Sequence, residues 1–399
     1  MPIITNCSGT FTLNKSEPIH RWYSYIEGYS SKLVEKEFDQ LSKFKLHAVY
    51  DPFGGTGTTL LSSSVRGLVS YYSETNPFMR DVIDVKTNSI RSLLKKDPSL
   101  ESLRTLYNRI TQTELVPTVF TDEYTGFEKY YNPVVLQEIL WLQKIVDEIT
   151  ESNSRKIAML ALSSILVDSS KMIRRGDLRY ARPNEKGIIS ARMKFQEKLS
   201  TIIEDIINHG NDVRCETIAL APDAREVTEN DIVDCIITSP PYLNGTNYIR
   251  NTKLELKLNG YVKQESDLAL FHSRGVIAGI NNVSKRNTAE QTLPEVIPYI
   301  EALTPLAYDK RIPLMVNGYF NDMNKVFHKL RNILMNNGFF IMDIGDSQFA
   351  GVHIPTHTIL TSLCNNHGFR LYDDEILRKR RSKNGMELTQ RLLRFRLEK

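Results

Sequence analysis

Residues 46–76 read LHAVYDPFGGTGTTLLSSSVRGLVSYYSETN, and this stretch decides the fold. An apolar run leads into DPFGGTG, an apolar helical pattern follows, and a second β-rich run ends at Glu74. Glycine tolerates the positive φ angles of a tight turn and lets a ligand approach the backbone closely. The order strand, glycine-rich turn, helix, strand predicts one unit of a mostly parallel sheet, which binds its ligands at the carboxyl ends of the strands.

The rest of the chain predicts a helical block followed by further strands. Residues 77–210 are helical in pattern, as in QEILWLQKIVDEI, where apolar residues recur every three or four positions. Strand patterns return in DIVDCIIT and GFFIMDIGDS and in the tail, FRLYDDEILRKRR and RLLRFRLEK, and NDMNKVFHKLRNILMNNG predicts a helix closed by its Asn-Asn-Gly. We therefore predict an α/β fold: a Rossmann-like, mostly parallel sheet with a C-terminal antiparallel hairpin and a helical insertion.

The expected domain boundaries follow this pattern. Residues 1–90 form the first part of the sheet domain, residues 91–211 the helical insertion, and residues 212–399 the second part of the sheet domain. The insertion is large and lies outside the common sheet, so it can carry a function that the sheet itself does not provide. We expect the insertion to recognise the substrate.

Composition indicates a soluble globular protein in a reducing, cytoplasmic setting. The chain has 399 residues, 41% hydrophobic and 25% charged, and a formal net charge of +4, which permits a polyanionic partner. The four cysteines, Cys7, Cys215, Cys235 and Cys364, lack the paired spacing of a zinc site or a disulfide framework, and we expect no metal. No apolar run reaches the length of about 18 residues that a membrane span needs, and the N-terminus does not have a secretory pattern.

A second motif, TSPPY, ends the DIVDCIIT strand at residues 238–242. Two consecutive prolines have no amide donor, so the strand stops there and the backbone is stiff. The Ser239 hydroxyl and the Pro240 carbonyl are hydrogen-bond acceptors, and Tyr242 offers an aromatic face. In isolation, a polyproline-like loop or a simple strand stop is the better interpretation of this motif.

The glycine loop and its acidic neighbours also leave alternatives open. The loop lacks the Gly-Lys-Ser/Thr of a P-loop and the full dinucleotide-binding spacing, so a purely structural turn is one interpretation. Glu74, at the end of the next strand, is placed to accept hydrogen bonds from a ribose diol. Asp223, in ALAPDARE, is either a third ligand-contacting acid or a helix N-cap.

DPFGGTG followed downstream by TSPPY resembles the S-adenosylmethionine-dependent DNA amino-methyltransferases, in particular the N4-cytosine enzymes of restriction–modification systems. The resemblance covers about residues 19–75 and 223–399 and implies a class I methyltransferase sheet. It implies that the glycine loop holds the methionine part of the cofactor, that Glu74 holds the ribose and that Asp223 contacts the adenine. HRWYSYIEGYS, from His20, resembles the segment that closes over the methionine end. The cofactor-binding residues implied are Asp51, Pro52, Phe53, Gly54, Gly55, Thr56, Gly57, Glu74, Asn76, Asp223, Thr238, Trp22 and Tyr23.

For catalysis, the resemblance implies that Ser239, Pro240, Pro241 and Tyr242 act on the exocyclic amine of a base flipped out of duplex DNA. The amine lone pair is delocalised into the base, and acceptors aimed at its N–H bonds favour a pyramidal nitrogen that faces the methyl donor. Alignment then drives transfer without covalent catalysis. Cys235 lies inside the strand, so we interpret it as core packing, which argues against C5-cytosine methylation.

DNA contacts are expected from basic and polar residues in two stretches. One lies in the insertion, and the other is the segment 244–295 that follows the TSPPY motif, although a solvated basic face explains either stretch as well. The candidate residues are Arg174, Arg175, Arg179, Asn244, Tyr248 and Arg250.

Several alternatives remain open on the sequence alone. In the resembled family, serine before the prolines accompanies cytosine N4 and aspartate accompanies adenine N6, but the correlation is imperfect, so N6-adenine methylation stays an alternative. An RNA amino-group methyltransferase and a catalytically idle DNA-binding module are the other two. The expected partners are duplex DNA and a cognate restriction endonuclease.

Overall fold

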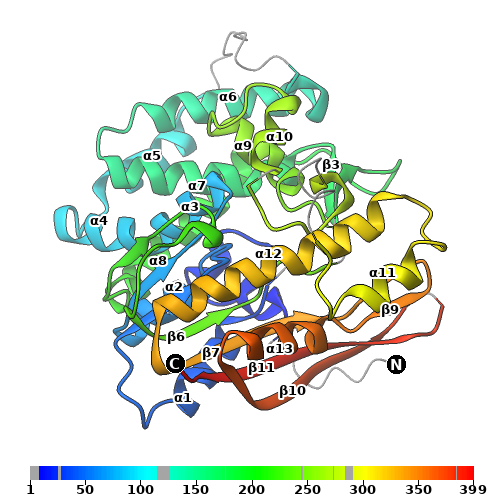
Figure 1. The fold of residues 1–399 in the computed structure, drawn as a ribbon. Coiled ribbons are helices and arrows are strands. Elements are labelled where there is room, and N and C mark those ends of the chain that lie inside the picture. The colour runs from blue at the N-terminus through cyan, green and yellow to red at the C-terminus, as the bar shows by residue number, and fades with distance from the viewer. Residues whose placement is uncertain are drawn as a thin grey trace.

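The computed structural model describes residues 9–25, 28–114, 126–175, 177–243, 246–272, 274–283, 291–382 and 384–399, with the backbone alone for Arg175 and Asp177. One seven-stranded sheet organises the described chain (Figure 1). Its strands in spatial order are β10 (Phe369–Arg381), β11 (Glu387–Leu397), β7 (Leu334–Gly345), β6 (Val233–Thr238), β1 (Ala48–Asp51), β2 (Val69–Tyr72) and β5 (Thr217–Ala219).

The pairing of these strands confirms the predicted fold class. The β5, β2, β1, β6 and β7 strands pair in parallel, whereas β11 is antiparallel to both β7 and β10. The last two strands are therefore the predicted C-terminal antiparallel hairpin. The β1 and β6 strands are central, so the two motifs that follow them meet at one edge of the sheet.

Alternate residues of the central strands pack against helices on opposite faces of the sheet. Val49 and Cys235 face α1, whereas Tyr50 and Ile236 belong to the cluster that contains α12 and α13. The elements around the sheet are α1 (Ser31–Gln40), α2 (Thr58–Arg66), α11 (Ile297–Leu303), α12 (Arg311–Ile333), α13 (Thr356–Asn366) and the short hairpin of β8 (Ser347–Phe349) and β9 (Val352–Ile354).

A helical body with its own apolar core lies above the sheet in the view of Figure 1. It comprises α3 (Pro77–Asp84), the π-helical turn η4 (Val85–Ser89), α4 (Ile90–Lys96), α5 (Glu101–Gln112), α6 (Pro133–Asp147), α7 (Ser152–Ser169), the hairpin of β3 (Met172–Arg175) and β4 (Asp177–Tyr180), and α8 (Ala191–His209). Asn76 and Asn132 cap α3 and α6, each accepting a hydrogen bond from the second residue beyond it, with proline at the first helical position.

Two further segments share the core of the helical body. One is the N-terminal turn η3 (His20–Trp22), and the other follows the TSPPY motif and contains η9 (Arg250–Thr252), α9 (Lys253–Leu258) and α10 (Leu268–His272). Leu254, Leu256 and Leu258 are all buried in this core. The candidate insertion and the segment after TSPPY therefore form one packed unit at the pocket side of the sheet.

Candidate active site

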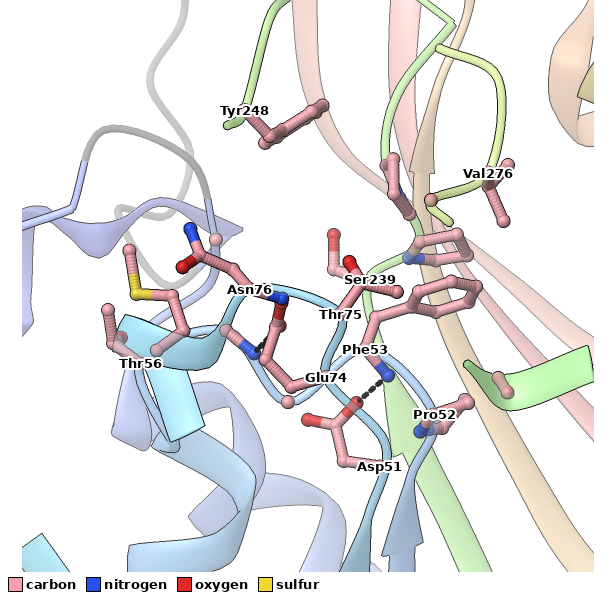
Figure 2. Close-up of a pocket in the computed structure, with 18 of the residues that line it drawn as sticks. Asp51, Pro52, Phe53, Thr56, Glu74, Thr75, Asn76, Ser239, Tyr248 and Val276 are labelled. Carbon is pink, nitrogen blue, oxygen red and sulfur yellow. Dashed lines mark hydrogen bonds between the residues drawn. The ribbon is translucent and has the colours of Figure 1, made fainter. Parts of the chain in front are cut away.

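A pocket opens at the carboxyl ends of β1 and β6, and most of the predicted site residues line it. The glycine loop and the serine–proline loop both line it, and Tyr248 and Val276 lie at the far side from Asp51 (Figure 2). The predicted residues that line it are Asp51, Pro52, Phe53, Gly54, Gly55, Thr56, Glu74, Asn76, Asp223, Ser239, Pro240, Pro241, Tyr242 and Tyr248. Two motifs from distant parts of the chain therefore share one cavity.

The glycine loop is held by close packing and by a buried carboxyl. Gly57 has a φ of 81°, and a Cβ there would lie 3.2 Å from Ile83, so the residue fixes the turn without lining the pocket. Asp51 accepts hydrogen bonds from the Phe53 amide (3.0 Å) and the Thr238 hydroxyl (2.7 Å). Thr238 therefore acts through Asp51, since it is not among the lining residues. Burial raises the pKa of Asp51 to about 6, although these hydrogen bonds act in the opposite direction.

Glu74 is a buried acid tied to the glycine loop. Its carboxyl accepts hydrogen bonds from the amides of Gly55 and Asn76, each at 2.8 Å. Burial raises the pKa of Glu74 to about 7 because the hydrogen bonds only partly offset the loss of solvent. The carboxyl is therefore a pocket-lining acceptor whose charge changes near neutral pH.

Asp223 caps a turn and also lines the pocket. It caps the short turn η8 (Ala224–Glu226) by accepting the Arg225 amide, and its carboxyl is paired with the Arg225 guanidinium at 2.6 Å. It lines the pocket together with Pro222 and Ala224. The Arg225 pairing fixes the orientation of this acid.

The serine–proline loop leaves β6 at Thr238 and is braced on its far side by Tyr242. The Tyr242 amide donates to the Tyr248 hydroxyl at 3.1 Å, and its own hydroxyl hydrogen-bonds to the buried carboxyl of Asp343. Asp343 also accepts both Gln390 contacts, at 2.9 and 3.0 Å. Burial raises the pKa of Asp343 to about 7, against the effect of these two donors.

Gly345, two residues beyond Asp343 on β7, lets the Tyr242 ring lie against the strand. A Cβ at Gly345 would lie 3.1 Å from the ring, and the backbone there has no positive φ. Sequence reasoning missed Asp343, Gly345 and Gln390. The only sequence sign was a single acid within the apolar run of GFFIMDIGDS.

Trp22 and Tyr23 do not line the pocket, contrary to the contact expected of them. The Trp22 indole donates to Asp205 at 2.9 Å, and the Tyr23 hydroxyl donates to Glu255 at 2.9 Å; both rings are buried in the helical body. The structure gives them a packing role, because each polar atom is satisfied inside the protein. From the same N-terminal region, Tyr25 and Tyr29 line the pocket instead.

Lys86 is a further residue that sequence reasoning missed. It is 1% exposed, and its ammonium donates to the carbonyls of His20 and Thr56, each at 3.2 Å. In the described part of the chain no carboxylate pairs with it, and burial lowers the pKa of Lys86 to about 7. It lies in the π-helical turn η4, a geometry frequent at functional sites, and it joins the glycine loop to the N-terminal turn.

The candidate DNA-binding residues are placed differently from one another. Arg174 forms a buried ion pair with Glu255, so its charge is used inside the protein. Arg179 is paired with Glu185 at 2.7 Å, Arg250 is exposed on η9, and Tyr248 lines the pocket. Asn244 and the side chain of Arg175 lie outside the described residues.

The structure bears on two expectations from the sequence, that Cys235 packs in the core and that the chain holds no metal. Cys235 is fully buried in β6, and burial raises the pKa of its thiol, so it packs in the core. Within the described ranges, no group of three or more histidine, cysteine or acidic side chains could hold a metal ion. Among the same residues, no helix is both long and apolar enough to cross a membrane.

Known proteins resemble this chain over most of its length, although no family model matches it. It is 24% identical over 398 residues to the Type II methyltransferase M.AvaI of Nostoc sp. (strain PCC 7120 / SAG 25.82 / UTEX 2576), covering 91% of this chain and 81% of the relative. The chain is a homologue of Type II methyltransferases. This methyltransferase homologue is also 21% identical to M.BsoBI of Geobacillus stearothermophilus (95% and 84% covered) and 20% identical to M.MvaI of Kocuria varians (89% and 83% covered).

Proposed function

We propose that this methyltransferase homologue transfers a methyl group from S-adenosylmethionine to the exocyclic N4 amine of a cytosine within a specific duplex DNA site. The observation that carries the proposal is that two loops line the same pocket: the glycine loop with Glu74, and the loop from Ser239 to Tyr242. The first suits a cofactor and the second suits an amine. Because its relatives are Type II methyltransferases, we further propose that it protects DNA from a cognate restriction endonuclease.

The chemistry of the residues that line the pocket fits S-adenosylmethionine. Asp51, Glu74 and Asp223 line the cavity, and burial raises the pKa values of the first two. A ligand with a ribose diol and a sulfonium charge supplies the donors and the positive charge that such carboxyls favour. Phe53 and Met79 add apolar surface for the rest of the ligand.

The bound cofactor would supply an activated methyl group on a sulfonium. The chain's own residues would then place the amine. The Ser239 hydroxyl and the Pro240 carbonyl accept its two N–H bonds, and the adjacent prolines keep these acceptors rigid. Tyr242 offers its ring to a flipped base, since its hydroxyl is already held by Asp343 and its ring lies against Gly345.

Recognition of the DNA sequence is assigned to the helical body. The β3–β4 hairpin contacts η9, which carries Arg250, so part of the insertion lies next to the pocket wall at Tyr248. Tyr180, on the same hairpin, is 50% exposed and stacks on Tyr130. Exchanging residues 91–211 with those of a relative should change the methylated site. If the methylated DNA sequence stays the same, recognition belongs instead to the segment after TSPPY.

The test is transfer of a labelled methyl group to defined nucleic acids. Duplex DNA that contains many sequences should accept label, whereas transfer RNA should not. Ser239→Ala should lower the turnover number about 100-fold, the size of effect seen when one preorganised hydrogen-bonding group is removed from an active site. Ser164→Ala, a matched change inside α7, should leave turnover unchanged. Label in transfer RNA alone would replace the proposal with RNA methylation.

A further inference from the structure

Charge is segregated along β10, at the outer edge of the sheet. Three acids lie in its first half, and the structure pairs each of them with a cation of α1 or β11: Asp373, Asp374 and Glu375. Four cations follow in a row at residues 378–381. The second half of the strand therefore carries positive charge that the first half does not neutralise.

The direction of the strands places these cations at the pocket edge. Gln390, near the start of β11, pairs with Gly345, the last residue of β7. Arg381 pairs with Glu387 at the end of the same hairpin. The hairpin end thus lies at the carboxyl edge of the sheet, where β1 and β6 deliver the two pocket loops.

Hydrogen bonds fix this end of the hairpin relative to the serine–proline loop. The Arg380 guanidinium donates to the Asp346 carbonyl at 3.1 Å, and the Thr389 hydroxyl donates to the Asp346 carboxyl at 2.8 Å. Asp346 directly follows Gly345, which lies against the ring of Tyr242. The cations are therefore held at a defined position beside the proposed catalytic loop.

Two of the four cations are available to an external anion. Lys379 is paired with Glu387, and Arg380 is engaged with Asp346. Arg378 and Arg381 are both exposed, and neither forms an ion pair with a described acid, although Arg381 lies across the hairpin from Glu387 and interacts with its charge. Exposed guanidinium groups of this kind suit phosphate oxygens, which they contact in a bidentate manner.

We infer that the end of the β10–β11 hairpin, through Arg378 and Arg381, contacts the phosphate backbone of duplex DNA beside the target base. The inference rests on the proposed function, because that function supplies the polyanion. The interaction is independent of base sequence and positions the duplex over the pocket. It places part of the DNA contact on the sheet domain, in addition to the helical body that we assign to recognition.

The test compares two charge reversals in the full-length protein by the salt dependence of duplex binding. The hairpin variant is Arg378→Glu with Arg381→Glu. The matched control is Lys43→Glu with Lys45→Glu, which changes net charge equally. These two residues lie just before β1, at the amino ends of the parallel strands and away from the pocket loops. Affinity for S-adenosylmethionine, measured by calorimetry, reports whether each variant is folded. The milder pair Arg378→Gln with Arg381→Gln repeats the test without introducing negative charge.

The hairpin variant should bind duplex DNA on the order of tenfold more weakly. The slope of log affinity against log salt should fall in magnitude by about 0.9 for each DNA phosphate that the variant no longer neutralises. The control should keep the wild-type slope, and all variants should bind the cofactor normally. Equal slopes in hairpin variant and wild type, or equal weakening of the hairpin variant and the control, would overturn the inference. Failure of the wild type itself to bind or methylate duplex DNA would instead refute the proposed function.

Discussion

The hydroxyl of Tyr242 hydrogen-bonds to the buried carboxyl of Asp343, and this pair ties the serine–proline loop to the neighbouring strand β7. Asp343 is 1% exposed, and its other described partner is the Gln390 amide. A tyrosine fixed at both its amide and its hydroxyl presents one ring orientation to a substrate. Rigid placement of this kind is what a reaction driven by alignment requires.

Loss of this hydrogen bond should reduce turnover and leave cofactor binding intact. Tyr242→Phe removes the donor while keeping the ring, and Asp343→Asn changes the acceptor while keeping its shape. Each should lower the turnover number about fivefold, since one such hydrogen bond is worth about 1 kcal/mol. Steady-state kinetics and cofactor titration measure the two quantities. A larger loss of cofactor affinity than of turnover would show that Tyr242 belongs to the cofactor site.

Gly345 offers a test of ring position that changes no polar group. Alanine there would bring a Cβ to 3.1 and 3.2 Å from two Tyr242 ring carbons, so the ring must shift by a few tenths of an ångström. Gly345→Ala should therefore lower turnover with little change in thermal stability. Gly187→Ala is the control, because a Cβ there meets no atom within 4 Å. Unchanged turnover in Gly345→Ala would mean that the ring position does not matter for catalysis.

Cofactor affinity should fall as the pH falls through about 7. Burial raises the pKa of Glu74 to about 7, and only its ionised form accepts two hydrogen bonds from a diol. Protonation therefore removes the binding form, and affinity should decrease by up to about tenfold per pH unit below the pKa. Glu74→Gln should bind more weakly and lose most of this dependence between about pH 6 and 8. A wild-type affinity that is flat over this range would contradict the assignment.

Lys86 should contribute to cofactor binding more than to stability. Lys86→Met removes the ammonium that joins the Thr56 and His20 carbonyls, so cofactor affinity should fall about tenfold. The melting temperature should stay equal or rise, because an ammonium buried without an acid partner is costly. Lys95→Met, exposed on α4, is the control. A lower melting temperature with normal cofactor binding would make Lys86 purely structural.

Local patterns in the sequence predicted the sheet and the two pocket loops well. Strand, glycine turn and proline stop each follow from a few adjacent residues, and their meeting follows from the parallel topology. The end of α12 was misplaced: the helix ends at Ile333, and the Asn-Asn-Gly lies within β7, because Leu334 already pairs with Val233.

Long-range partners could not be predicted in this way. Trp22 is satisfied by Asp205, 183 residues away, and Arg174 by Glu255, 81 residues away. Each looked available for a ligand because the acid that binds it is distant in the chain. Lys86 was not identified from the sequence, because no residue near it in the chain indicates that its ammonium is buried.

The central claim is that Ser239 and its neighbours direct a methyl group to a cytosine amine. Duplex DNA can be incubated with the purified protein and S-adenosylmethionine, digested to nucleosides, and analysed by mass spectrometry. The account predicts N4-methylcytosine that depends on the cofactor and is about 100-fold slower to form with Ser239→Ala. DNA that contains only N6-methyladenine, or no methylated base, would contradict it.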